Sequence, residues 1–139
     1  GDARVVGLKA SFLAWAGRCA EGLGVIEHAM RLDPNYGGWI AWAKGHALLF
    51  LGRLNEAIAE LKSGIVRQPE FMPLHLHLAV ALSRLGQMDE ALKALKSAVD
   101  ASPTVRPEEL IDVPYKNPAD LELVSSALRA IMARAGSAA

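Results

Sequence analysis

The sequence predicts an all-α fold, a right-handed solenoid of three stacked helical hairpins followed by a C-terminal capping helix. Two observations lead to this prediction. Helix-breaking and small residues recur about every 34 residues, and the apolar residues between them fall at three- and four-residue steps. Because one hairpin cannot bury its apolar face alone, hairpins that repeat in this way stack side by side.

The period is set by two kinds of helix-breaking residue, which recur at spacings of 35 and then 34 residues. The prolines are Pro34, Pro69 and Pro103, and the glycines are Gly17, Gly52 and Gly86. The chain is therefore interpreted as one domain, residues 1–139. Its predicted parts are units at about 3–36, 37–71 and 72–105, a connector at 106–116 and a capping helix at 117–135.

Within each unit these marks predict where two helices begin and end. The glycines end the first helix, because a residue without Cβ adopts the left-handed conformation at little cost. The second helix starts three to four residues later, with an acid (Glu21, Glu56 or Glu90) near its positive end. The prolines stop the second helix, since proline has no N–H to continue the helical bonds.

Small residues stand midway along each expected first helix, at Ala10, Gly45 and Ala79. They are expected to let the partner helix approach closely. The single cysteine, Cys19, has a packing position equivalent to Leu54 and is interpreted as a small buried hydrophobe rather than a nucleophile.

The tail predicts one further helix. Asn117 is a good N-cap and Pro118 stands where a first-turn proline is favoured. An apolar stripe then runs to about residue 135 through Leu121, Val124, Leu128, Ile131 and Met132. We interpret this helix as a cap over the last hairpin, with a dedicated partner-binding helix as the alternative.

Residues 51–58 (LGRLNEAI) align with residues 85–92 (LGQMDEAL). At these residues the sequence resembles the tetratricopeptide repeat family, which has a period of 34 residues, and the resemblance extends over about residues 3–104. It implies a hairpin solenoid that serves as a protein-interaction module. The first unit departs from the family in having Gly22 where alanine is usual. Lys9 and Lys44 replace the large apolar residue that Leu78 supplies in the third unit.

A second resemblance lies in residues 113–121 (VPYKNPADL). This segment resembles the ending of bacterial proteins that join such repeats to a class III adenylate or guanylate cyclase domain. It implies that the chain is the regulatory end of a signalling protein. Residue 1 is glycine, which also leads us to expect a fragment of a longer protein.

The first helices of stacked hairpins line a concave face, and their outward residues are predicted to form a partner-binding groove. All three tryptophans map to this surface. The candidate residues are Trp15, Trp39, Trp42, His46, Leu49, Phe50, Leu76, Val80 and Arg84. Aromatic residues together with an arginine are typical of an interface hot spot.

Three interpretations of this groove remain open at this point. A protein or peptide partner, or a second copy of the chain, fills it. The capping helix or neighbouring repeats fill it instead, or it stands open to solvent. The first interpretation predicts a protein-binding module, with homo-oligomerisation as the alternative function.

One known binding mode of the tetratricopeptide repeat family is not expected in this chain. Some members hold the acidic carboxy-terminal tail of a chaperone with charged and amide side chains. The corresponding positions here carry no fixed charge. They are Gly7, Ser11, Ala43, Pro73 and His77.

Composition and residue spacing argue against several other classes of function. The 15 basic and 15 acidic residues give a net charge of zero, so a nucleic-acid partner is not expected. No stretch approaches the roughly 18 apolar residues of a membrane span, and one cysteine cannot make an internal disulfide, so a cytoplasmic location is expected. His75 and His77 would point roughly 200° apart on a helix and cannot share a metal. No catalytic residue, metal or cofactor is predicted.

Overall fold

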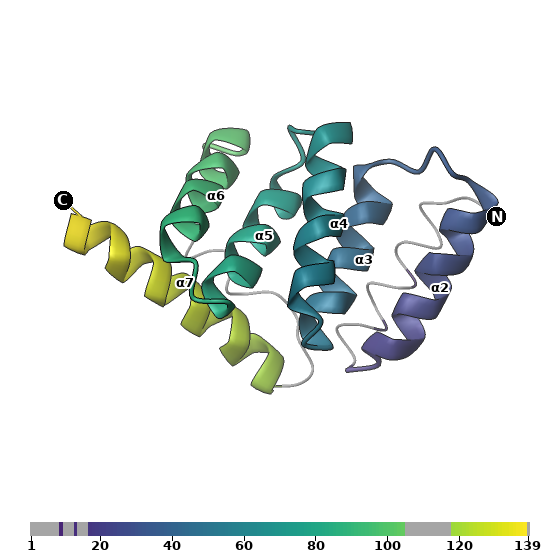
Figure 1. The fold of residues 1–139 in the computed structure, drawn as a ribbon, viewed down its shortest axis with the longest axis horizontal. Coiled ribbons are helices and arrows are strands. Elements are labelled where there is room, and N and C mark those ends of the chain that lie inside the picture. Colours follow the sequence, from purple (N-terminus) through teal and green to yellow (C-terminus); the bar gives the residue numbers. More distant parts are fainter. Residues whose placement is uncertain (1–8, 10–12, 14–16, 105–117, 139) are drawn as a thin grey trace.

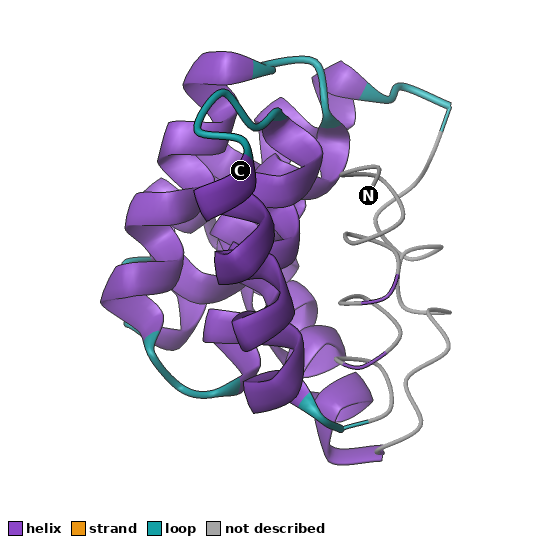
Figure 2. Ribbon diagram, turned by 90° about the vertical axis from the view of Figure 1, so that its right-hand side faces the viewer, coloured by secondary structure: helices purple, strands orange, loops and turns teal. Residues whose placement is uncertain are grey.

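The computed structural model describes residues 9, 13, 17–104 and 118–138 (Figure 1). The described helices are α2 (Cys19–Leu32), α3 (Gly38–Phe50), α4 (Leu54–Arg67), α5 (Met72–Arg84), α6 (Met88–Ala101) and α7 (Pro118–Ala138). Within these ranges the secondary structure is entirely helical, with loops between the helices (Figure 2). The all-α prediction is confirmed.

The helices pack in the order in which they follow one another. α3 contacts α4 and α5 contacts α6 within the hairpins, while α2–α3 and α4–α5 contacts join one hairpin to the next. Figure 1 shows these helices side by side, with α7 running obliquely past the end of the row. This arrangement is the predicted solenoid of helical hairpins.

The glycines predicted to end the first helices adopt the left-handed conformation. Their φ angles are +81° at Gly17, +77° at Gly52 and +82° at Gly86. After α3, the Arg53 N–H donates to the Leu48 carbonyl over 2.9 Å and the Gly52 N–H donates to the Leu49 carbonyl over 3.1 Å. This pair of bonds is the Schellman motif, which needs a left-handed residue and so explains the glycine.

Close packing inside the second hairpin depends on another glycine. A Cβ atom added at Gly45 would lie 2.5 Å from Cγ of Leu61, which is fully buried in α4. The expectation that a small residue midway along the first helix permits close approach is confirmed here. Ala79 is also fully buried. Ala10 lies outside the described residues.

The last helix, α7, packs against α5 and α6. Its buried face consists of Val124, Ala127, Leu128 and Ile131, and Arg134 reaches back to Asp89 over 2.8 Å. The described helix runs from Pro118 to Ala138, which is beyond the predicted end near residue 135. The final residues are mostly small and contain no proline to stop it. Asn117 and the predicted connector lie outside the described residues.

Candidate binding face

Eight of the nine predicted groove residues lie on α3 and α5, which contact each other across the boundary between two hairpins. We call this surface the α3–α5 face. Helix α3 is apolar on almost all sides, since ten of its thirteen residues are buried. A helix buried all round must be covered by more than its hairpin partner, and α5 supplies part of that cover.

Six rings form a continuous aromatic cluster at this boundary. Its members are Trp39, Trp42, His46, Phe50, Phe71 and His77. Trp39 and Trp42 have ring centroids 5.1 Å apart, and His46 stacks on Trp42 at 5.3 Å with an interplanar angle of 29°. Phe71 meets Trp39 edge-on at 5.7 Å. Such pairs stabilise by about 0.5–1.5 kcal/mol each beyond the area they bury, so the cluster ties α3 rigidly to α5.

One hydrogen bond inside the cluster crosses from α3 to α5. The Trp42 indole N–H donates to Nδ1 of His77 over 3.0 Å. The Pro73 carbonyl also lies 2.9 Å from this nitrogen, but one neutral nitrogen cannot both accept and donate. The indole is a buried donor with no other role, whereas a helical carbonyl already accepts from the backbone N–H four residues on. We therefore assign Nδ1 of His77 as the acceptor and place its proton on Nε2.

Both imidazoles of the cluster are neutral at pH 7. Burial lowers the pKa of His46 well below 6.5, and the charge of a protonated His77 would lower it further. Burial also lowers the pKa of His77 to about 4, although the Pro73 carbonyl acts in the opposite direction. The two rings meet edge to face with centroids 5.0 Å apart. A proton on either ring would have to be held in an apolar interior.

The structure separates the predicted groove residues into three groups. Five are buried within the chain: Trp42, His46, Leu49, Leu76 and Val80. Trp39 and Phe50 are half-buried and Arg84 is exposed. Trp15 lies outside the described residues.

Two members of the cluster were not among the predicted groove residues. Phe71 precedes α5, where no helical periodicity marks it. His77 stands on α5 one position from the predicted Leu76, and its pairing with Trp42 depends on how the hairpins stack. A sequence signal did exist for His77, because it is 35 residues from Trp42 and therefore one period away.

Trp39 carries the polar atom that stands out on this face. Its indole N–H is buried and has no hydrogen-bond acceptor among the residues that the structure describes. An unsatisfied buried donor costs about 1–3 kcal/mol. The half-buried Trp39 thus offers part of an aromatic surface to a ligand, while its N–H lies inside the chain.

The side chains of this face are suited to packing against a ligand. The cluster presents ring faces and ring edges, and its two imidazoles are held neutral. Over residues 17–104 and 118–138, no group of three or more His, Cys, Asp or Glu side chains is arranged to hold a metal ion. None of the described helices is long and apolar enough to cross a membrane.

Comparison with known proteins supports the repeat architecture. Residues 48–110 match the model of the tetratricopeptide repeat. No curated protein matches the sequence. The first tetratricopeptide domain of Spaghetti (RPAP3), solved with the HSP90 peptide SRMEEVD, superposes with a TM-score of 0.72 at 15% identity, covering 96% of this chain and 93% of that one.

Two structures of the type III secretion translocator chaperone SycD of Yersinia enterocolitica also superpose. One holds a peptide of the translocator YopD, with a TM-score of 0.67 at 21% identity, covering 94% of this chain and 92% of that one. The other is described as an alternative dimer, with a TM-score of 0.69 at 21% identity and coverage of 95% and 92%. The predicted fold class, a tetratricopeptide-type solenoid, is confirmed.

Proposed function

We propose that this chain is a protein-interaction module that binds a partner protein or peptide on the α3–α5 face. The observation that carries the proposal is Trp39, a half-buried indole whose ring packs on Trp42 and Phe71 and remains partly exposed. The fold supports the proposal, because two of the proteins that share it were solved with bound peptides.

The candidate residues divide into those that contact a ligand and those that hold them. Trp39, Phe50 and Arg84 are accessible at least in part and would touch the partner. In the interior, Trp42 packs on Trp39 and His46 packs on Phe50, so these two buried rings fix the positions of the two half-buried ones. Preorganised aromatic side chains lose little entropy on binding, which favours recognition by this face.

The ligand that we propose is an apolar peptide segment that packs against the exposed part of the Trp39 ring. A tail rich in carboxylates, like the peptide bound by Spaghetti, fits less well. Of the positions that would clamp such a tail, Ala43 has no polar atom and His77 is neutral at pH 7, with a pKa of about 4. Arg84 is the one fixed positive charge among the candidate residues.

The test begins with peptides selected from a random display library on the full chain. Each peptide is mapped by ¹H–¹⁵N correlation spectra, in which Trp39→Phe identifies the Trp39 indole signal by its loss. We expect ligands that shift this signal and bind Trp39→Ala at least about tenfold more weakly, as for a hot-spot residue. Leu32→Ala, which truncates an exposed apolar side chain on α2, is the matched control.

If every selected peptide leaves the Trp39 indole signal unmoved and binds Trp39→Ala as well as the unchanged chain, the α3–α5 face is not the binding site. An acidic tail that binds tightly and also shifts the Trp39 indole signal would contradict the proposed ligand chemistry but not the site.

Self-association is the second candidate function. Val66 is 84% exposed, so its apolar side chain is available to a second copy of the chain. One structure of the similar chaperone SycD is described as a dimer. Light scattering over a dilution series distinguishes the candidates, since a dimer that persists on dilution favours self-association and a monomer favours recognition of another protein.

We also propose that the module is part of a larger signalling protein. This rests on the likeness of residues 113–121 to the ending of repeat proteins joined to a nucleotide cyclase domain. Reading the gene on the upstream side of residue 1 tests the proposal. A cyclase domain there would support it, and an unrelated domain would overturn it.

A further inference from the structure

Outside the α3–α5 face, the solenoid has two equivalent grooves between the second helices of successive hairpins. The first lies between α2 and α4 and has α3 as its floor. The second lies between α4 and α6 and has α5 as its floor, and we call it the α4–α6 groove. Corresponding residues in the two grooves are one period apart, so their chemistry can be compared position by position.

The floor of the first groove carries a charge that is paired within the chain. Lys44 lies there with its ammonium nitrogen 3.9 Å from a carboxylate oxygen of Glu60, and both side chains are mostly buried. Tyr36 also donates a hydrogen bond to Glu60 over 3.1 Å. This floor therefore offers a ligand little apolar surface.

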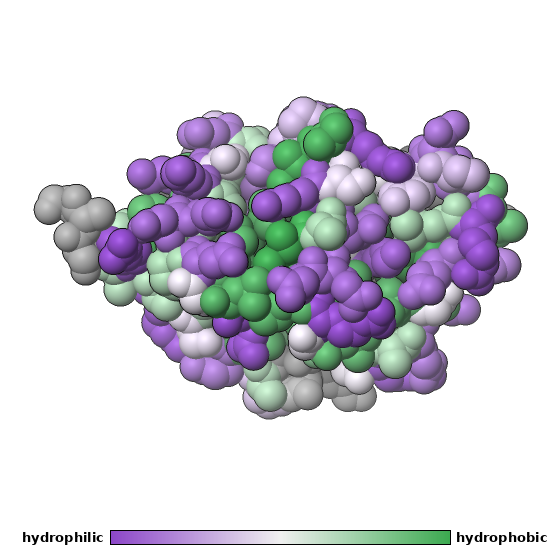
Figure 3. Space-filling model, in the orientation of Figure 1, coloured by the Kyte–Doolittle hydropathy of each residue, from purple (hydrophilic) through white to green (hydrophobic). Residues whose placement is uncertain are grey.

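The α4–α6 groove has an apolar floor in the same register. Leu78 stands where the first groove has Lys44, and Ala94 stands where it has Glu60. Leu82 continues the floor, and Ile65 and Val66 line the α4 side. The groove has a volume of about 570 Å³, which is in the range of sites that bind ligands. Figure 3 shows a band of hydrophobic side chains over this part of the surface.

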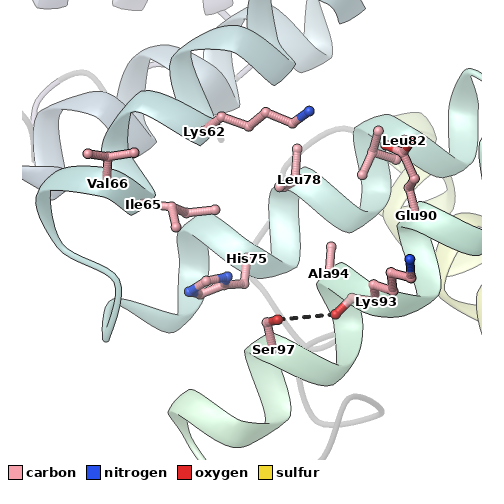
Figure 4. A pocket seen from close by; sticks show the side chains of 10 residues that line it. All are labelled: Lys62, Ile65, Val66, His75, Leu78, Leu82, Glu90, Lys93, Ala94 and Ser97. Atoms are coloured by element: carbon pink, nitrogen blue, oxygen red, sulfur yellow. Dashed lines mark hydrogen bonds between the residues drawn. The ribbon is translucent and has the colours of Figure 1, made fainter.

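The rims of the α4–α6 groove carry positive charge. Lys62 on α4 replaces Glu27 of the first groove, and Lys93 on α6 replaces Ala59. Both lysines are exposed, and among the described residues neither ammonium group makes an ion pair. Glu90 is the single acid that lines the groove. Figure 4 shows Lys62 extending from α4 beside Leu78, with Lys93 on the α6 side.

We propose that the α4–α6 groove is a second docking site, which takes an acidic segment of a partner protein that also presents apolar side chains. The apolar side chains would cover Leu78, Leu82 and Val66, and carboxylates on either side would pair with Lys62 and Lys93. Charge complementarity selects this occupant, because lysines line both sides of an apolar floor and one acid, Glu90, lies beside Lys93 on α6. The site is separate from the α3–α5 face, so both can be occupied in one chain.

The experiment compares variants that differ only in where the same change is made. Peptides from the same display selection are measured against Lys93→Glu and against Lys96→Glu, which reverses an exposed charge on the same helix outside the groove. Val66→Asp is paired with Leu32→Asp, an equivalent change at an exposed apolar residue of α2. Circular dichroism and thermal melting verify that all four variants fold.

We expect a class of selected peptides rich in Asp or Glu and in Leu, Ile or Val. These should bind Lys93→Glu and Val66→Asp about three- to tenfold more weakly, bind the two control variants unchanged, and lose affinity as salt is added. They should leave the Trp39 indole signal unmoved. If no acidic class is selected, or if Lys93→Glu and Lys96→Glu behave alike, the proposed site is wrong whatever the outcome at Trp39.

Discussion

The α3–α5 face and the α4–α6 groove both gather apolar side chains, but they use them in opposite ways. On the α3–α5 face, Trp42 is 6% exposed and its ring, edge and N–H all have partners inside the chain. In the groove, Val66 is 84% exposed and stands one helical turn from Lys62 on α4. An apolar residue therefore marks a binding surface only where the fold leaves it uncovered, and the predictions that follow test this contrast.

The largest effect is expected from Trp42→Ala. The change removes a large buried side chain and leaves His77 without its donor, so the free energy of unfolding should fall by about 3–5 kcal/mol. Denaturant unfolding followed by circular dichroism measures the loss. Trp42→Phe keeps a ring but not the N–H and should cost roughly 1 kcal/mol. A loss below about 1 kcal/mol for Trp42→Ala would mean that the aromatic cluster does not hold the hairpins together.

The next largest effect is expected from lowering the pH, which should lower the free energy of unfolding. The pKa of His77 is about 4 in the folded chain and about 6.5 when unfolded, so between these values the unfolded state binds more protons. The free energy of unfolding is therefore highest above pH 6.5. It falls as the pH drops to 4, by on the order of 3 kcal/mol from His77 alone. The lowered pKa of His46 acts in the same direction.

Carboxylates also begin to titrate near pH 4, so the acid prediction is tested by difference. His77→Gln keeps an acceptor for Trp42 but cannot be protonated, and it should flatten the dependence of unfolding free energy on pH between 6.5 and 4.5. His75→Gln is the matched control, because His75 lines the open α4–α6 groove. Equal slopes for His77→Gln and the unchanged chain would contradict the assignment of a buried neutral imidazole.

A smaller effect is expected from two glycines within helices. Gly45→Ala places a Cβ 2.5 Å from Leu61 Cγ in the closely packed second hairpin and should cost about 1–3 kcal/mol. Gly24→Ala meets no atom within 4 Å on α2 and should stabilise by up to about 1 kcal/mol through helix propensity. Thermal melting of both variants measures the difference. The same sign for both would mean that close approach does not determine the role of Gly45.

The repeat could be predicted from the sequence, because the residues that define it depend only on the local conformation of the chain. A left-handed turn needs glycine whatever surrounds it, so the three glycines with positive φ could be identified from spacing alone. The burial of Trp42 and Val80 could not be predicted in this way. Helix α3 is apolar on both sides, and periodicity does not tell which neighbour covers a side. Whether the nine predicted groove residues bind a partner stays a prediction.

The α4–α6 groove also leaves a signal in the sequence. Lys44 departs from the repeat pattern that Leu78 follows. The structure adds that Glu60 pairs with Lys44, and that both charges are lost together one period later. Paired changes at positions one period apart thus indicate where a repeat protein has changed the chemistry of a groove.

The smallest stability effect is expected from Val66→Ala. A side chain that is 84% exposed contributes little to folding, so the free energy of unfolding should change by less than about 0.5 kcal/mol. Affinity for an acidic peptide should nevertheless fall, because Val66 lines the groove. Denaturant unfolding at several protein concentrations separates the possibilities. A concentration-dependent loss above about 1 kcal/mol would show that a second copy of the chain covers Val66, and the groove would then serve self-association instead of docking an acidic partner.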